Sequence, residues 1–243
     1  MDAHCIKRAP RQAHNVRTVV FSDTKEANEL INDLEAYPHA YVLACLMNRQ
    51  VDANTAWTLP YKFRQRFDSF DFEKMAPLSL DDIYDLFRNP APLHRYTEMM
   101  AEIFHSGVRH IEDIYDGDAS GIWSNNPSSA EVVSRFLQFE GVGPKIATMA
   151  ANILAREFKV AFSDYYSIDI SVDVHIKRVM KRLGLVPNNP TDTQIIYKAR
   201  AINPEFPGLI DLPCWKIGKE WCRPTNPKCN ECLMNALCPT SNQ

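Results

Sequence analysis

Four cysteines near the end of the 243-residue chain constrain its fold more than any other feature. Cys222, Cys229, Cys232 and Cys238 follow the spacing C-x6-C-x2-C-x5-C. So many thiols in so short a stretch are not ordinary core packing, because thiolates repel one another unless a cation neutralises them. A soft metal ion or an iron–sulfur cluster supplies that cation. The string therefore predicts a metal centre.

Disulfides and zinc are the alternatives to a cluster. The N-terminal residues Met1 to Arg8 lack the apolar core of a signal peptide, which favours a reducing cytoplasm, where closely spaced cysteines indicate a metal site. Structural zinc usually draws its ligands from two short Cys-x2-Cys pairs, and only Cys229 and Cys232 form such a pair here. The spacing favours a four-cysteine iron–sulfur cluster over zinc.

Composition sets broad limits on the rest of the chain. With 45% hydrophobic and 23% charged residues, it is typical of a soluble globular protein with one large or two modest domains. No apolar run is long enough to cross a bilayer. A net charge of −3 gives no overall attraction to nucleic acid, so any DNA binding requires local basic patches.

The apolar spacing predicts a mainly helical protein. Helix starts are indicated at residues 23–26, at Pro38 and at Ser79. A further helix is predicted over residues 92–105, with Gly107 as its C-terminal cap. Residues 168–172 differ, because β-branched and polar residues alternate there, which predicts a short extended segment.

A helical hairpin is predicted in the middle of the chain. A capping box at Ser128 opens a helix that must end at Gly141, and Pro144 suits the first position of the next helix. The start of that second helix leaves backbone N–H groups unpaired, so Gly141, Val142 and Gly143 can bind a DNA phosphate without reading the bases. A plain connection between two helices is the alternative interpretation of this turn.

Three motifs together resemble one family. The run from Phe139 to Ala147 resembles the helix-hairpin-helix of endonuclease III-type DNA glycosylases, and Val172 to Val179 resembles their Val-Asp-x-His segment. The cysteine string matches that family's [4Fe–4S] loop spacing, and Gly218 precedes it at the family's position. The similarity spans about residues 135–239.

The resemblance implies a fold and a cofactor. It implies an all-α protein with the two-lobed HhH-GPD glycosylase architecture. One lobe is a central helical barrel domain over residues 36–156, which ends in the hairpin. The other is an iron–sulfur cluster domain formed by residues 1–35 and 157–243, with a [4Fe–4S] cluster on the four cysteines.

Two catalytic residues follow from the same resemblance. Lys145 matches the lysine that attacks the sugar C1′ in bifunctional members, and an amine attacks only in its neutral form, which a nearby helix N-terminus favours. Asp173 matches the aspartate that assists departure of the base. The alternatives are a lysine that only neutralises phosphate and an aspartate that only caps the helix after it.

Further DNA contacts are implied with less detail. Gln50 lies where family members insert a polar side chain into the gap left by an extruded base, although it can equally be a polar loop residue. Arg223 and Lys228 lie in the cysteine loop and match basic residues that meet the DNA backbone. The implied partner is double-stranded DNA that contains a damaged base or an abasic site. We expect a monomer that acts away from membranes, in the cytoplasm on nucleoid DNA.

The predicted function is base excision repair by a bifunctional DNA glycosylase/AP lyase, with an oxidised pyrimidine as the first choice of substrate. 8-Oxoguanine, uracil and alkylated bases are the alternatives. A monofunctional glycosylase, with Asp173 activating water, and a non-catalytic damage-binding protein also fit the motifs. Phe139 and Glu140 replace the usual Leu-Pro, and Lys145 precedes Asp173 by 28 positions, more than in endonuclease III. This insertion is predicted to border the base pocket.

Overall fold

The computed structural model describes residues 18–241 and confirms an all-α protein, since no strand occurs in this part of the chain. The α-helices are α1 (Lys25–Asn32), α2 (Pro38–Leu46), α3 (Ala53–Phe67), α4 (Phe72–Met75), α5 (Leu80–Arg88), α6 (Thr97–Tyr115), α7 (Ser129–Leu137), α8 (Pro144–Arg156), α9 (Val174–Arg182), α10 (Asp192–Ile202) and α11 (Asp211–Glu220). Short 3-10 helices are η1 (Ala119–Ile122), η2 (Pro207–Ile210), η3 (Cys229–Glu231) and η4 (Asn235–Leu237).

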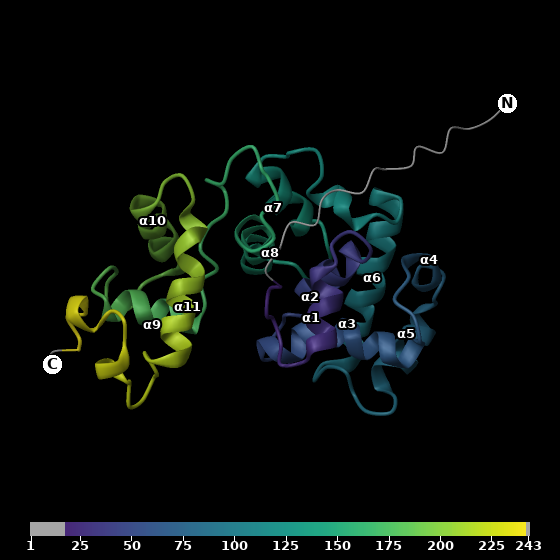
Figure 1. The fold of residues 1–243 in the computed structure, drawn as a ribbon, viewed down its shortest axis with the longest axis horizontal. Helices are drawn as coiled ribbons and strands as arrows, with labels where there is room; N and C mark the ends of the chain where they lie inside the picture. The colour runs from purple at the N-terminus through teal and green to yellow at the C-terminus, as the bar shows by residue number, and fades with distance from the viewer. Residues whose placement is uncertain (1–17, 242–243) are drawn as a thin grey trace.

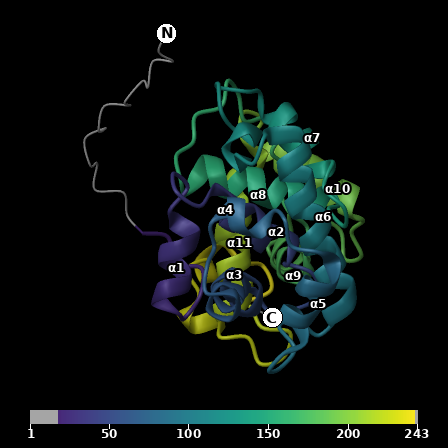
Figure 2. The ribbon, with the colours of Figure 1, turned by 90° about the vertical axis from the view of Figure 1, so that its right-hand side faces the viewer.

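The helices form two lobes (Figure 1). Helices α1 to α6 lie on one side, α9 to α11 with the C-terminal loop lie on the other, and α7 and α8 lie between them. Helix α2 is buried along its whole length at the centre of the larger lobe, where it packs against α1, α3, α6 and α8. Seen from the end, the helices of this lobe surround α2 (Figure 2).

Local sequence signals place several helix starts correctly. Capping boxes form at Ser79 and Ser128, where each serine accepts a backbone hydrogen bond from the third helical residue. Pro38 and Pro144 are the first residues of α2 and α8. Proline suits this position because the N–H group that it lacks would have no partner within the first turn of the helix.

The prediction of a helix end at Gly107 is wrong. Helix α6 continues through this residue to Tyr115. A Cβ on Gly107 would lie 2.6 Å from Cδ1 of Leu46, so the glycine lets α6 approach α2 closely. Its role is in packing between helices, a role that a single sequence does not distinguish from capping.

The smaller lobe has its own core. Its buried residues come from the segment before α9 and from α9, α10 and α11; they are Ile170, Ile176, Val179, Met180, Ile195, Ala199 and Cys214. The larger core extends from Leu30 to Ile168. No described helix has the length and apolar character needed to span a bilayer.

Residues 168–173 connect the two cores. This segment pairs with no strand among residues 18–241, but its alternation has a physical reason: Ile168 is buried in the larger core and Ile170 in the smaller one. Between them, Asp169 accepts two hydrogen bonds from Arg200 of α10, at 2.7 and 2.8 Å. Residues 168–173 thus form the bridge between the lobes.

Helix α1 packs differently from the predicted domain division. The predicted cluster domain includes residues 1–35, yet Leu30 and Ile31 are buried in the larger core and α1 packs against α3 and α2. Residues 1–17 and 242–243, which belong to the same predicted domain, lie outside the described part of the chain.

Candidate functional site

The turn between α7 and α8 has the geometry predicted for a phosphate-binding hairpin. Gly141 has φ of +76°, a conformation that glycine adopts at little cost, and a Cβ there would lie 2.9 Å from Cδ1 of Ile103. At Gly143 no neighbouring atom lies within 4 Å of the position that a Cβ would take, so its backbone is open to an approaching group. The first turn of α8 leaves N–H groups without intrahelical partners, which favours an anion.

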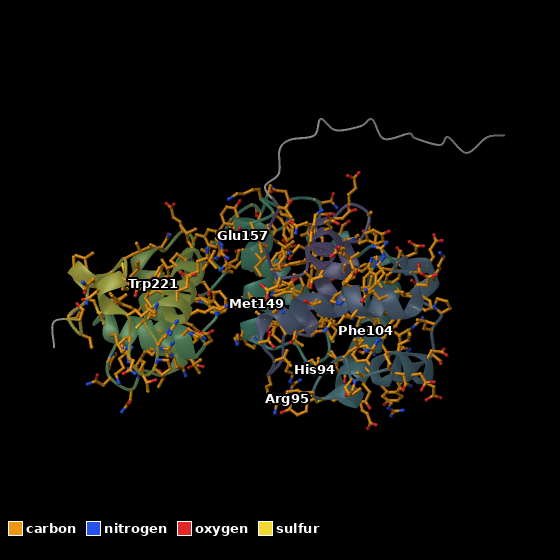
Figure 3. All side chains as sticks on the ribbon, turned by 60° about the horizontal axis from the view of Figure 1, so that its bottom comes forward. His94, Arg95, Phe104, Met149, Glu157 and Trp221 are labelled. Carbon is orange, nitrogen blue, oxygen red and sulfur yellow. The ribbon has the colours of Figure 1, made fainter. Side chains whose placement is uncertain are left out.

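Lys145 is the second residue of α8 and is exposed to solvent. Met149 follows one turn later on the same face of the helix. It lies on the side of the larger lobe that faces the lobe carrying Trp221 (Figure 3). The helix therefore places the lysine beside the hairpin, on the face directed toward the smaller lobe.

Asp173 is the N-cap of α9, as the capping alternative predicted. Its Oδ1 accepts hydrogen bonds from the N–H groups of His175 and Ile176, both at 2.8 Å. Both bonds use the same oxygen, so Oδ2 takes no part in the cap. The cap fixes the half-buried carboxylate in place and leaves one oxygen for another partner.

A buried polar contact joins the segments that carry Lys145 and Asp173. Thr148, three residues after Lys145, donates to the carbonyl of Pro144 at 2.8 Å. Its hydroxyl also lies 3.4 Å from the hydroxyl of Ser171, two residues before Asp173. The structure thus brings the two predicted catalytic segments together, although they belong to different lobes.

The segment after α2 also reaches this region. Asn48 donates to Sδ of Met149 at 3.5 Å, and Nη1 of Arg49 lies 3.3 Å from the position a Cβ on Gly141 would take. The exposed side chain of Gln50 accepts a hydrogen bond from the hydroxyl of Tyr96 at 2.8 Å. Gln50 therefore lies on a segment that touches both α8 and the hairpin.

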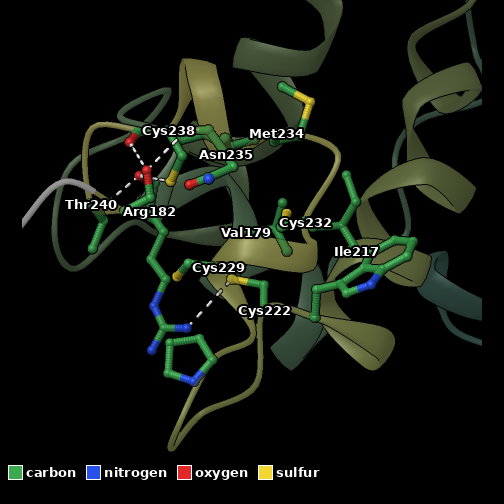
Figure 4. Close-up of a pocket in the computed structure, with 14 residues that line it drawn as sticks. Val179, Arg182, Ile217, Cys222, Cys229, Cys232, Met234, Asn235, Cys238 and Thr240 are labelled. Atoms are coloured by element: carbon green, nitrogen blue, oxygen red, sulfur yellow. Dashed lines mark hydrogen bonds between the residues drawn. The ribbon is translucent and has the colours of Figure 1, made fainter.

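The four cysteines of the string surround one cavity of about 110 Å³. Apolar side chains, including Val179, Ile217 and Met234, complete its wall (Figure 4). All six cysteines in the described part of the chain are free thiols, so the disulfide alternative does not hold there. No group of three or more His, Cys, Asp or Glu residues within 18–241 is arranged to hold a metal ion.

Two arginines of α9 hold the cysteine loop. Arg182 donates to Sγ of Cys222 at 3.4 Å and to the carbonyl of Arg223 at 2.7 Å. Arg178 donates to the carbonyl of Cys222 at 2.6 Å. The predicted DNA contacts Arg223 and Lys228 are both exposed on this loop, and Lys228 pairs with Glu231 at 3.2 Å.

Comparison with known proteins identifies the family of a chain with this hairpin, lysine and capped aspartate. The profile of the HhH-GPD superfamily of base excision DNA repair proteins matches residues 43–204. The chain belongs to this superfamily.

Curated relatives agree with this assignment. Endonuclease III of Thermotoga maritima is 27% identical over 167 residues, which cover 68% of this chain and 67% of the relative. Endonuclease III-like protein 1 of Gallus gallus is 29% identical over 139 residues, which cover 55% of this chain. The matched part spans only 41% of the length of the chicken protein.

Solved structures show the same fold. A non-covalent endonuclease III–DNA complex superimposes with a TM-score of 0.61 at 17% identity, covering 89% of this chain and 93% of that one. A trapped endonuclease III–DNA covalent intermediate gives a TM-score of 0.59 at the same identity and coverage. A thermostable thymine-DNA glycosylase gives 0.56 at 18% identity, covering 84% of each chain.

Sequence reasoning missed the residues that support the site. Thr148, Ser171, Tyr96 and Arg182 belong to no motif, and each acts through a contact with a distant part of the chain. The cluster of basic residues on α9 was a signal for Arg182, but its ordinary interpretation is a solvated face. Asp211 likewise lies outside every motif.

Proposed function

We propose that this protein is a bifunctional DNA glycosylase/AP lyase of base excision repair. It acts on double-stranded DNA that contains a damaged base, with an oxidised pyrimidine as the first choice of substrate. The observation that carries the proposal is the Thr148–Ser171 contact, which joins the segment of an exposed Lys145 to that of a capped Asp173.

DNA binding starts from the backbone. The N–H groups at the start of α8 and the open backbone at Gly143 bind a phosphate, a contact that does not depend on sequence. Arg49 beside Gly141, together with Arg223 on the cysteine loop, adds positive charge for neighbouring phosphates. Gln50 fills the space in the stack after the damaged nucleotide has rotated out of the duplex.

The chemistry then uses both catalytic residues. The neutral Nζ of Lys145 attacks C1′ of the extruded sugar, and the bond to the base breaks with its electron pair going to the base. The free oxygen of Asp173 stabilises the positive charge that develops on the sugar. Nζ then loses a proton and the C1′–O4′ bond breaks, with O4′ taking up a proton, so that Lys145 is joined to the opened sugar as a Schiff base. Removal of a 2′ proton next expels the 3′ phosphate, which cuts the strand 3′ to the lesion.

Trapping with borohydride tests this proposal. Reduction of the Schiff base on abasic-site DNA is expected to link the wild-type protein covalently to DNA, and Lys145→Ala is expected to abolish the adduct. Lys181→Ala, which removes an exposed lysine of α9, serves as the control and keeps it. A wild-type protein that gives no adduct contradicts the lyase proposal.

The monofunctional alternative predicts a different result. In that case Asp173 activates water, so base release persists in Lys145→Ala and disappears in Asp173→Asn. Base release that survives both substitutions contradicts the assignment of the site. Duplexes with single modified bases, compared by kcat/KM, decide among oxidised pyrimidines, 8-oxoguanine, uracil and alkylated bases, and no release from any of them favours a damage-binding protein.

We propose that the four cysteines hold a [4Fe–4S] cluster. In a four-iron cluster, each of the four thiolates binds a different iron, so the thiolates lie around a cage and not on one ion. The four thiols of this chain line a common cavity with mostly apolar walls. Cys222, Cys229, Cys232 and Cys238 would hold the cluster, which supplies structural cohesion to the smaller lobe, and Arg182 compensates thiolate charge at Cys222. About four iron and four sulfide per chain are expected on analysis, and zinc in their place contradicts the proposal.

The remaining expectations concern the setting of the protein. We propose that it acts as a monomer on nucleoid DNA in the cytoplasm. Analytical ultracentrifugation of the free protein and of its DNA complex tests the first point, and fractionation of cells tests the second.

A further inference from the structure

A carboxyl group outside every motif lies beside the proposed active site. Asp211 is the first residue of α11, and its Oδ2 accepts a hydrogen bond from the backbone N–H of Ser171 at 2.9 Å. Ser171 is 6% exposed, and its hydroxyl meets Thr148, which is 7% exposed. Asp211 is therefore the half-buried end of a polar chain that runs through the buried Ser171 and Thr148 and starts one turn after Lys145.

The bond to Ser171 holds this carboxyl group beside the segment that reaches Asp173 two residues later. Burial raises the pKa of Asp211, and the negative charge of Asp173 acts in the same direction. The hydrogen bonds from Ser171 and the positive charge of Arg156 act against this rise. Arg156 is itself bonded to Glu157 at 2.8 Å, so its charge is shared. Cys214, one turn along α11, also senses both carboxylates.

Such an arrangement is costly for a purely structural residue. A carboxylate that is partly removed from water beside another negative charge destabilises the folded protein relative to a neutral side chain of the same shape. An asparagine at position 211 would still accept the bond from Ser171. The bond to Ser171 therefore does not depend on the negative charge of Asp211.

We propose that Asp211 is a positioning residue of the active site: it fixes the segment that leads to Asp173, and its charge strengthens the negative field that Asp173 presents to the sugar. The inference rests on the proposed role of Asp173. The positive charge that develops at the anomeric carbon is stabilised by both carboxylates, although only Asp173 reaches it.

Asp211→Asn separates the effect of the negative charge from that of the hydrogen bond with Ser171. It keeps the acceptor for Ser171 and removes the charge, so KM for DNA is expected to stay within about twofold while kcat falls about tenfold. The acid limb of the pH profile of base release is expected to move to lower pH, because the variant lacks the Asp211 carboxyl group, whose raised pKa makes it lose its charge as the pH falls.

Asp169→Asn is the matched control. It weakens the Arg200 anchor of the same segment but leaves the surroundings of Asp173 unchanged. Its pH profile is expected to keep the wild-type acid limb. A profile of Asp211→Asn that superimposes on the wild type, or the same shift in Asp169→Asn, overturns the proposal.

A stability measurement separates this inference from the proposed function. The raised pKa means that the folded state holds a proton more tightly than the unfolded state, so the free energy of unfolding falls as pH rises through the titration of Asp211. The denaturation midpoint of Asp211→Asn, measured relative to that of the wild type, is therefore expected to rise from acid to neutral pH. The stability gain from Asp211→Asn is expected to be smaller in a protein that also carries Asp173→Asn. This result does not depend on whether the protein releases bases. Strictly additive effects of the two substitutions contradict the coupling of the two carboxylates.

Discussion

Gly141 shows how one residue serves both the turn and the proposed contact with DNA. Its φ of +76° lies in the left-handed region, which costs other residues about 1–2 kcal/mol. Its neighbour Gly143 has φ of −104°, which any residue can adopt, and open space around it. The turn therefore requires the first glycine, and the proposed phosphate contact uses the open backbone at the second.

Alanine substitutions at these glycines are expected to affect different properties. Gly141→Ala should lower the free energy of unfolding by about 1–2 kcal/mol, because it combines an unfavourable φ with a close approach to Ile103. Gly143→Ala should change it by less than about 0.5 kcal/mol but weaken DNA binding, because its methyl group enters the space that a phosphate would use. Chemical denaturation and DNA titration measure the two effects. Equal stability losses in both variants would contradict the assignment.

Two buried thiols are expected to be inert. Burial raises the pKa of Cys45 to about 12 and that of Cys214 to about 11. The thiolate is the reactive form, so neither should be alkylated in the folded protein at neutral pH. Mass spectrometry after brief iodoacetamide treatment measures this, with denatured protein as the control. Modification of Cys214 in the folded state would show that α11 does not pack as described.

The same thiols make stability depend on alkaline pH. Their folded-state pKa values exceed the ordinary value of 9.0, so the folded state keeps protons that the unfolded state releases. The free energy of unfolding should therefore fall as pH rises from about 9 toward 11. Cys45→Ala combined with Cys214→Ala should flatten this part of the curve, and an unchanged slope would point to other groups.

Helices α2 and α6 depend on their close approach at Gly107. Gly107→Ala should lower the free energy of unfolding by about 1–3 kcal/mol, because the new methyl group would overlap the side chain of Leu46. Ser106→Ala on the same helix is the control and should be nearly neutral. In a Leu46→Ala background, Gly107→Ala should cost less than in the wild type if the overlap is the cause of the loss. Thermal unfolding of the wild type, the three single variants and this double variant measures the difference.

Helix α9 supports the cysteine loop through Arg182. Arg182→Gln removes the guanidinium beside Cys222 and the bond to the carbonyl of Arg223, so the proposed cluster should be lost faster in air. Lys181→Gln, an exposed position on the same helix, should retain it. The decay of visible absorbance follows the loss. Equal decay in both variants would mean that Arg182 gives the loop no support.

The two cores differ greatly in size, so the smaller lobe is expected to unfold more readily than the larger one. Seven buried residues form the smaller core, too few to stabilise the lobe without further support. Removing the proposed cluster should therefore abolish amide protection in α9, α10 and α11, while α2 and α6 of the larger core remain protected. Hydrogen exchange before and after removal measures this. Protection that persists in α9 to α11 would show that the smaller lobe is stable by itself.

Much of the fold and of the site could be predicted from local spacing. Helix starts at Pro38, Ser79 and Ser128 follow from residues that satisfy backbone groups within one turn, and these predictions are confirmed. The cap at Asp173 and the turn at Gly141 are equally local. The sequence spacing also limits the four cysteines to one loop, where they line a common cavity, but they are not gathered closely enough in residues 18–241 to hold a metal ion as they stand.

The sequence by itself determined where helices begin, where the chain turns and which chemical groups are available, because these depend on neighbours along the chain. Only the tertiary structure decided that α1 joins the larger core, that Gly107 allows two helices to approach, and that Ser171 links Thr148 to Asp211. The physical reason is that such contacts join residues far apart in sequence. They depend on how two separate cores pack, and no local spacing encodes that packing.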